Sequence, residues 1–196
     1  MKLTRDCKVI FPAYLVHAKT KRDKRQFIGE LGLRWIRLQR QRLRPGTGTV
    51  MFDIDDTLID NTEKVADGFE FMVKTFVEAS KLFVVYLVTA RPEDTRTGVI
   101  NLLYKLEIHI PPDRLFMLPT ELYSRDTSYV EKFKWDVFLK ISAAHCGVVA
   151  RFGDQVWDIA HINFIEGEES EHIDHKDCYF FMDYALGGTI SFKTPG

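Results

Sequence analysis

The stretch Thr49-Val50-Met51-Phe52-Asp53-Ile54-Asp55-Asp56-Thr57-Leu58 decides the fold of this chain. It begins as an apolar run, which predicts a buried strand, and leads directly into three carboxylates within four positions. Carboxylates this crowded repel one another unless a cation lies among them. Asp53 and Asp55 are two residues apart, so in an extended segment their side chains face the same crevice. The stretch therefore predicts an acidic site at the end of a strand.

Segments typical of strands and of helices alternate along the chain from this point. Strands are expected at 49–54, 82–88, 115–118 and 148–152, and helices at about 62–79, 92–106 and 128–144. This alternation predicts the α/β class, with a Rossmann-like, three-layer α/β/α arrangement around a parallel sheet. The run 82–88 is apolar throughout, as expected for a central strand that is buried on both faces. In the remainder, 160–196, we expect only an acidic loop and a last strand at 178–184.

Polar residues also follow the later strands. The carboxyl ends of strands in an open α/β sheet meet at one edge, where ligands bind. Residues expected near this edge are Thr89 and Arg91 after the second strand, Lys132 and Lys134 near the start of a helix, and Asp154 and Asp158 after the fourth strand. Lys132 and Lys134 are two residues apart, and side chains at this spacing on a helix point in different directions. We therefore expect only one of the two lysines to reach the site.

In this order, the motifs resemble those of the haloacid dehalogenase superfamily of aspartyl-nucleophile phosphohydrolases. The resemblance covers roughly residues 49–160. It is closest to the class B or plant acid phosphatase-like branch, subfamily IIIB. The segments that carry this similarity are 52–58, Thr89-Ala90-Arg91-Pro92-Glu93-Asp94-Thr95 with Asn101-Leu102, and Gly153-Asp154-Gln155 with Asp158. The resemblance implies the fold of that superfamily.

The resemblance also implies roles for the site residues. Asp53 would be the nucleophile that forms an aspartyl-phosphate, and Asp55 the general acid and base. Thr89 and a lysine would bind the phosphoryl oxygens. We expect Lys134 to be this lysine, because its spacing to Asp154 matches the branch, and Lys132 is the alternative.

Arg91 has two interpretations, as a structural residue at the helix entry or as a contact to the substrate. The implied cofactor is Mg²⁺, which hard oxygen ligands bind. Its ligands would be the Asp53 carboxylate, the Asp55 backbone carbonyl, Asp154 and, through a water molecule, Asp158.

The intervals between the motifs are short. Neither 57–89 nor 91–134 has room for a large cap domain, so we expect an open site. Such a site accepts bulky phosphorylated substrates, including nucleic-acid ends, although small substrates fit the pattern as well. The alternative is a non-catalytic scaffold that keeps this fold for binding. The set of catalytic residue types favours the enzyme.

Charge is divided unevenly along the chain. Residues 1–44 hold 13 of the 27 Lys and Arg residues and three of the 28 Asp and Glu residues, so they carry +10 and the rest carries −11. Pro45-Gly46-Thr47-Gly48 predicts a boundary between a basic N-terminal extension, 1–44, and a phosphatase domain, 45–196.

The extension contains the pattern of an amphipathic helix. Its apolar residues are Phe27, Leu31, Trp35 and Leu38, and we expect Gly29 and Gly32 to weaken its first turns, before about residue 33. The extension either recruits a polyanion such as nucleic acid or packs on the acidic body of the chain.

The sequence excludes a disulfide-stabilised scaffold and a protein with a transmembrane helix. The three cysteines form no Cys-x-x-Cys pair, and no apolar run approaches the roughly 20 residues that cross a bilayer. No secretory signal is found, so we expect a cytoplasmic protein without a membrane partner. His172, His175 and Cys178 have a spacing that suits zinc, but no fourth ligand accompanies them, and a solvated loop is the expected structure.

Overall fold

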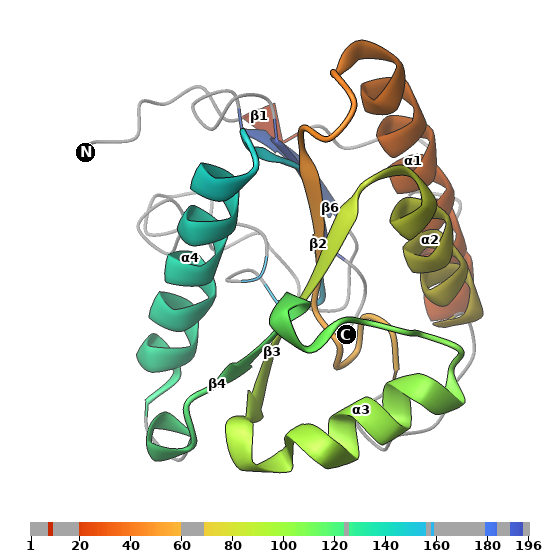
Figure 1. Cartoon of the computed structure of the whole chain (residues 1–196). Coiled ribbons are helices and arrows are strands. Elements are labelled where there is room, and N and C mark those ends of the chain that lie inside the picture. Colours follow the sequence, from red (N-terminus) through yellow and green to blue (C-terminus); the bar gives the residue numbers. More distant parts are fainter. Residues whose placement is uncertain are drawn as a thin grey trace.

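The protein is built around a mixed β-sheet (Figure 1). A computed structural model describes residues 8–9, 20–59, 69–123, 126–155, 158, 179–183 and 189–193. The strand order is β1-β6-β7-β5-β2-β3-β4. The strands are β1 (Lys8–Val9), β2 (Thr49–Phe52), β3 (Val84–Pro92), β4 (Leu115–Leu118), β5 (Val148–Gly153), β6 (Tyr179–Asp183) and β7 (Thr189–Lys193). Strands β7, β5, β2, β3 and β4 are parallel, whereas β6 and β1 pair in antiparallel fashion at one edge.

Helices cover both faces of this sheet (Figure 1). The helices are α1 (Lys21–Arg42), α2 (Phe69–Leu82), α3 (Arg96–Lys105) and α4 (Thr127–Ala144). One buried cluster joins side chains of α1, α2 and α3 to one face of the sheet, and a second cluster joins α4 to the other face. The three-layer α/β/α arrangement predicted from the sequence is confirmed.

Most of the expected elements are found with small shifts at their ends. Strand β4 matches its predicted range, and α4 and β5 differ from theirs by one residue. The helix expected from residue 92 begins later, because β3 continues to Pro92 and a single 3₁₀ turn, Glu93–Thr95, precedes α3. The first part of the helix expected at 62–79 lies outside the described residues. Strand β7 was not predicted, since its five residues carry no motif and follow a segment without clear periodicity.

The helix expected in the basic extension is found as α1, and its first turns, which contain Gly29, are stabilised by a cap. Its N-cap is Thr20, whose hydroxyl accepts a hydrogen bond from the Asp23 backbone N–H at 3.1 Å. In return, the Thr20 N–H donates to the Asp23 carboxylate at 3.2 Å, which completes a capping box. This cap stabilises the first turns. Gly29 and Gly32 therefore lie inside a continuous helix.

The two glycines let α1 approach its neighbours closely. A Cβ at Gly29 would lie 2.9 Å from Thr75 Oγ1 of α2, and a Cβ at Gly32 would overlap the ring of Phe152 in β5. Real Cβ atoms do not tolerate such contacts, so both positions need glycine. From the sequence, these glycines are expected only to lower the stability of the helix. Their packing partners lie more than 40 residues away in the chain, so no local pattern indicates the close contacts.

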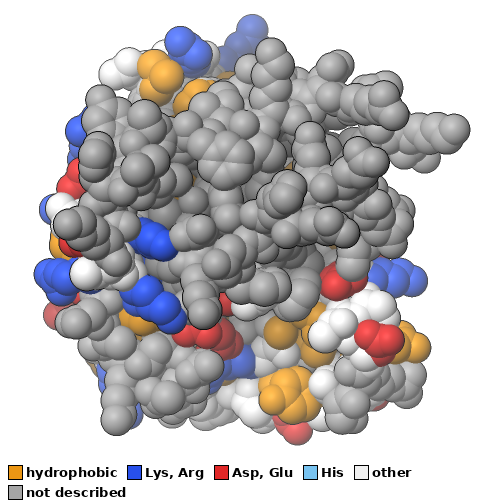
Figure 2. All heavy atoms as spheres, turned by 180° about the vertical axis from the view of Figure 1, so that it is seen from behind, with side chains coloured by type: hydrophobic (Ala, Val, Ile, Leu, Met, Phe, Trp, Pro, Cys, Tyr) orange, Lys and Arg blue, Asp and Glu red, His pale blue; other side chains and the backbone are white. Residues whose placement is uncertain are grey.

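Of the expected apolar residues of α1, Phe27, Leu31 and Trp35 pack against the core. Ile28 and Ile36 are fully buried, whereas Leu38 is 37% exposed. Trp35 is partly buried against the core, and its indole Nε1–H donates a hydrogen bond to the Val149 carbonyl at 2.8 Å. The boundary at Pro45 therefore marks a change in charge, while the helix before it shares the core of the sheet. Figure 2 shows Lys and Arg side chains on the outside of the molecule.

We expect Gly32→Ala to destabilise the protein by about 1–3 kcal/mol, because the added methyl group overpacks the contact between α1 and β5. Gly98→Ala in α3 is the matched control. A Cβ at Gly98 has open space within 4 Å, so this change should be neutral or stabilise the helix by up to about 1 kcal/mol. Urea denaturation of both variants measures the difference. Equal stability of the two would contradict the close approach of α1.

No cap domain is found among the described residues. Between β2 and β3 the structure describes a loop at 53–59 and α2, and between β3 and α4 it describes α3, β4 and short turns. The described helices include none with the length and apolar character that crossing a membrane requires.

Candidate active site

Asp53 lies at the carboxyl end of β2, in the middle of the sheet. Its side chain is buried, and its backbone N–H donates to the Phe152 carbonyl of β5 at 2.9 Å. The chain then turns sharply, because the Ile54 carbonyl accepts hydrogen bonds from the N–H groups of Leu58 at 2.9 Å and Ile59 at 3.2 Å. Asp56 has a φ of 51° in this turn, a left-handed conformation that aspartate tolerates better than most residues. The predicted acidic site therefore lies on a tight turn that directly follows the buried strand β2.

Lys134 reaches this site from α4. Its Nζ donates to Asp53 Oδ1 at 2.9 Å and also to Asp158 Oδ1. The side chain is 6% exposed, whereas Lys132 lies on the exposed side of the helix. Of the two lysines considered from the sequence, the structure brings Lys134 to the carboxylates.

Three carboxylates converge beside this lysine. Asp53, Asp154 and Asp158 each offer an oxygen, and these oxygens lie within 4.8 Å of one another. Burial raises the pKa of Asp53 well above its usual range, and the negative charges of Asp158, Asp154 and Asp55 raise it further. Burial also raises the pKa of Asp154 to about 7, with Asp158 adding to the shift. One lysine therefore leaves part of this negative charge uncompensated.

The ionised form of Lys134 is favoured in the same cluster. Burial lowers the pKa of Lys134, but the charges of Asp158 and Asp53 outweigh burial and raise the pKa above its ordinary value. A buried cation between carboxylates is stable only because these partners surround it. The residue thus carries a fixed positive charge beside the Asp53 carboxylate.

A divalent metal ion suits the remaining charge. The donors are carboxylate oxygens, which Mg²⁺ prefers, and their raised pKa values reflect a repulsion that a cation relieves. Asp53, Asp154 and Asp158 are therefore the residues that would hold it. The Asp55 backbone carbonyl as a fourth ligand, and a water molecule between Asp158 and the ion, stay predictions.

The loop after β5 holds Asp158 in place. The Gln155 N–H donates to Asp158 Oδ2 at 3.0 Å, and the Gln155 side-chain amide donates to Asp154. A Cβ at Gly153 would overlap the Asp158 side chain, so only glycine fits there. Gln155 and Gly153 were not assigned roles from the sequence, although Gly-Asp-Gln at the end of an apolar strand marked their position.

Asp55, Thr89 and Arg91 form a second group next to this cluster. Arg91 binds the Asp55 carboxylate in bidentate fashion, with Nη2 at 2.7 Å from Oδ1 and Nε at 3.1 Å from both oxygens. The buried Thr89 hydroxyl accepts from the Arg91 backbone N–H at 3.2 Å and lies 3.5 Å from Asp55 Oδ2. Of the two interpretations of Arg91, this geometry fits a residue that orients Asp55. The ion pair was not predicted from the sequence.

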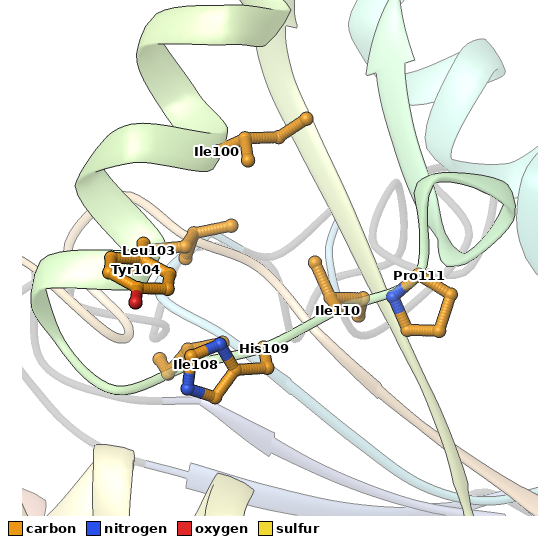
Figure 3. Close-up of a pocket in the computed structure, with 7 residues that line it drawn as sticks. All are labelled: Ile100, Leu103, Tyr104, Ile108, His109, Ile110 and Pro111. Atoms are coloured by element: carbon orange, nitrogen blue, oxygen red, sulfur yellow. The ribbon is translucent and has the colours of Figure 1, made fainter.

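Other candidates from the sequence lie elsewhere. Asn101 is exposed on α3, and the group of His172, His175 and Cys178 lies outside the described residues. A separate hollow of about 330 Å³ lies between α3 and the segment that follows it (Figure 3). Its lining is mainly apolar and includes Ile100, Tyr104 and Ile110 but none of the carboxylates.

Similarity to a solved structure is found at low sequence identity. No protein-family model matches the sequence, and the search of curated proteins gave no match. Among solved structures, the chain is similar to the class C acid phosphatase from Bacillus anthracis, with 11% identity and a TM-score of 0.49, over 74% of this chain and 69% of that chain. A likeness of this size assigns neither a family nor an activity.

Proposed function

We propose that this chain is a magnesium-dependent phosphomonoester hydrolase of the haloacid dehalogenase type, similar to the class B and plant acid phosphatase-like branch. The observation that carries the proposal is the contact of Lys134 Nζ with Asp53 at 2.9 Å, in a buried cluster with Asp154 and Asp158. A fixed cation beside a carboxylate at the carboxyl edge of a sheet is suited to binding a phosphate next to a nucleophile.

In the proposed reaction, an Asp53 oxygen attacks the phosphorus atom and the ester P–O bond breaks. Asp55 donates a proton to the leaving oxygen, which departs as an alcohol. Asp55 then takes a proton from a water molecule, whose oxygen attacks the phosphorus of the aspartyl-phosphate. The Asp53–phosphorus bond breaks, and inorganic phosphate and free Asp53 result.

The other residues position and stabilise these groups. Lys134 compensates negative charge on the transferring oxygens, and Thr89 contributes a hydroxyl at the next strand end. Arg91 orients Asp55, and a contact of its guanidinium to the substrate is part of the proposal. Mg²⁺ held by Asp53, Asp154 and Asp158 would neutralise charge between the carboxylate and the phosphate.

The proposed substrate is a phosphorylated molecule whose size the site does not restrict. Among the described residues, no cap covers the carboxyl edge of the sheet, and Asp55 is 31% exposed in its side chain. This exposure favours substrates that extend beyond the phosphate, with nucleic-acid ends among the candidates.

The test of the proposed function is hydrolysis of p-nitrophenyl phosphate by the full chain. We expect turnover with millimolar Mg²⁺, loss of nearly all activity in excess EDTA, and recovery when Mg²⁺ is restored, because the three carboxylates repel the phosphate without a cation. Ca²⁺ is the control ion, since its larger and looser coordination shell should bind without supporting turnover at the same rate. Full activity in EDTA would contradict the metal dependence, and absence of turnover under all conditions would favour the scaffold alternative.

A further inference from the structure

Five arginines lie in the C-terminal half of α1 and just after it, toward the amino ends of the strands and away from the carboxylates. They are Arg34, Arg37, Arg40, Arg42 and Arg44, and we call them the arginine edge. Helix α1 ends just before β2 begins, so this end lies beside the amino ends of the strands (Figure 1). Over its 22 residues, at about 1.5 Å of rise each, the helix places this end about 30 Å from its first turn.

The arginine edge carries charge of a single sign. The sequence contains no Asp or Glu from residue 31 to residue 52. Among the described residues, Glu78 is the carboxylate that comes within ion-pair distance of the edge, at 3.8 Å from Arg37. Arg34, Arg42 and Arg44 are exposed, and their guanidinium groups have no carboxylate partner in the described part of the chain. Figure 2 shows Lys and Arg side chains at the top of the view, over this end of α1.

We infer that the arginine edge is a docking surface for the phosphate backbone of nucleic acid. Guanidinium groups bind phosphate oxygens in bidentate geometry, and five of them follow one another within eleven residues. From Arg34 to Arg42 the helix rises about 12 Å, a length over which more than one phosphate of a nucleic-acid strand can be contacted. A repeated phosphate is the partner that matches these guanidinium groups, three of which have no carboxylate partner among the described residues.

A membrane surface is a poorer match. Interfacial helices insert a broad apolar face, whereas Leu38 is the one large apolar residue of α1 that is exposed, at 37%. The proposal also stands apart from the phosphatase chemistry, since the arginine edge and the carboxylates lie at opposite edges of the sheet. Loss of catalysis would therefore leave nucleic-acid binding intact. Loss of nucleic-acid binding would likewise leave catalysis on a small substrate intact.

The experiment measures fluorescence anisotropy of a labelled 20-nucleotide single strand with hydroxyl groups at both ends, so that the strand is not a phosphatase substrate. Titrations of the full chain in EDTA cover a salt series. The test variant is Arg34→Gln/Arg42→Gln/Arg44→Gln. Its matched control is Lys74→Gln/Lys105→Gln/Lys140→Gln, which removes the same charge from exposed positions on α2, α3 and α4.

We expect the arginine triple to weaken binding by about tenfold or more at low salt, and to reduce the slope of log affinity against log salt by about 2. The lysine triple should change affinity by less than about twofold, since those residues lie away from the edge. An Arg→Lys triple at the same three positions preserves the charge and should preserve the salt slope. Thermal melts and p-nitrophenyl phosphate turnover should be unchanged in all three variants, because the changed side chains are exposed.

Three results would overturn the inference. If the arginine triple and the lysine triple lose the same affinity for the oligonucleotide, binding depends on the net charge of the protein and not on the arginine edge. If the unchanged protein does not bind the oligonucleotide at low salt, the arginine edge is not a docking surface for nucleic acid. Poly-glutamate or phosphatidylserine vesicles that bind as tightly as the oligonucleotide, with the same loss in the arginine triple, would assign the edge to an acidic protein or a lipid surface.

Discussion

We expect Asp53→Asn to lower kcat for p-nitrophenyl phosphate by at least about a thousandfold. The amide oxygen of asparagine is a far weaker nucleophile than a carboxylate. The substitution also removes one oxygen ligand from the group of three carboxylates. Steady-state kinetics at saturating Mg²⁺ measures the effect. Equal rates for the two proteins would exclude Asp53 as the nucleophile.

The fold should survive this substitution. Burial and neighbouring negative charges raise the pKa of Asp53, so the folded protein disfavours its ionised form. Removing that charge relieves its repulsion with Asp154 and Asp158, and Lys134 keeps Asp158 as a charged partner, so the melting temperature in EDTA should stay unchanged or rise. The matched control is Asp113→Asn, an exposed carboxylate at the amino end of β4, which should change neither kcat nor stability. A fall in activity without a fall in melting temperature then assigns the loss to chemistry.

Lys134→Met should both abolish turnover and destabilise the protein without metal, by about 3–5 kcal/mol. The reason is that Lys134 is the cation in contact with Asp53 and Asp158, and its removal leaves buried carboxylates without compensation. Lys132→Met is the matched control, because that lysine is exposed on the same helix and its loss should cost less than about 0.5 kcal/mol. Urea denaturation in EDTA measures both values. Similar costs for the two variants would contradict the placement of Lys134.

The destabilisation should depend on pH and on metal. In the variant, the buried carboxyl groups keep pKa values above those of the unfolded chain, so the folded state binds more protons. Stability then falls as the pH rises from about 4 to about 7, and is greatest in acid. Mg²⁺ should recover part of the lost stability at neutral pH, since it supplies positive charge to the same oxygens. No effect of Mg²⁺ would argue against a metal site at these carboxylates.

Expectations from the sequence succeeded where a local pattern carried the information. Strands β2, β3, β4 and β5 and helix α4 follow from apolar runs and helical periodicity, which neighbouring residues define among themselves. The acidic stretch after β2 was located for the same reason, since strand ends place such residues at one edge. In α1, Gly29 and Gly32 were expected to weaken the first turns, but the capping box at Thr20 and the glycine contacts outweigh their low helix propensity.

By itself, the sequence determined the α/β class, the positions of strands β2, β3, β4 and β5 along the chain and the identity of the acidic residues. Only the tertiary structure decided that Lys134, and not Lys132, meets Asp53, because these two residues are 81 positions apart. The pairing of Arg91 with Asp55, 36 positions away, was decided in the same way. Local periodicity places a side chain on an element, whereas the packing of elements around one sheet determines which distant charges become partners.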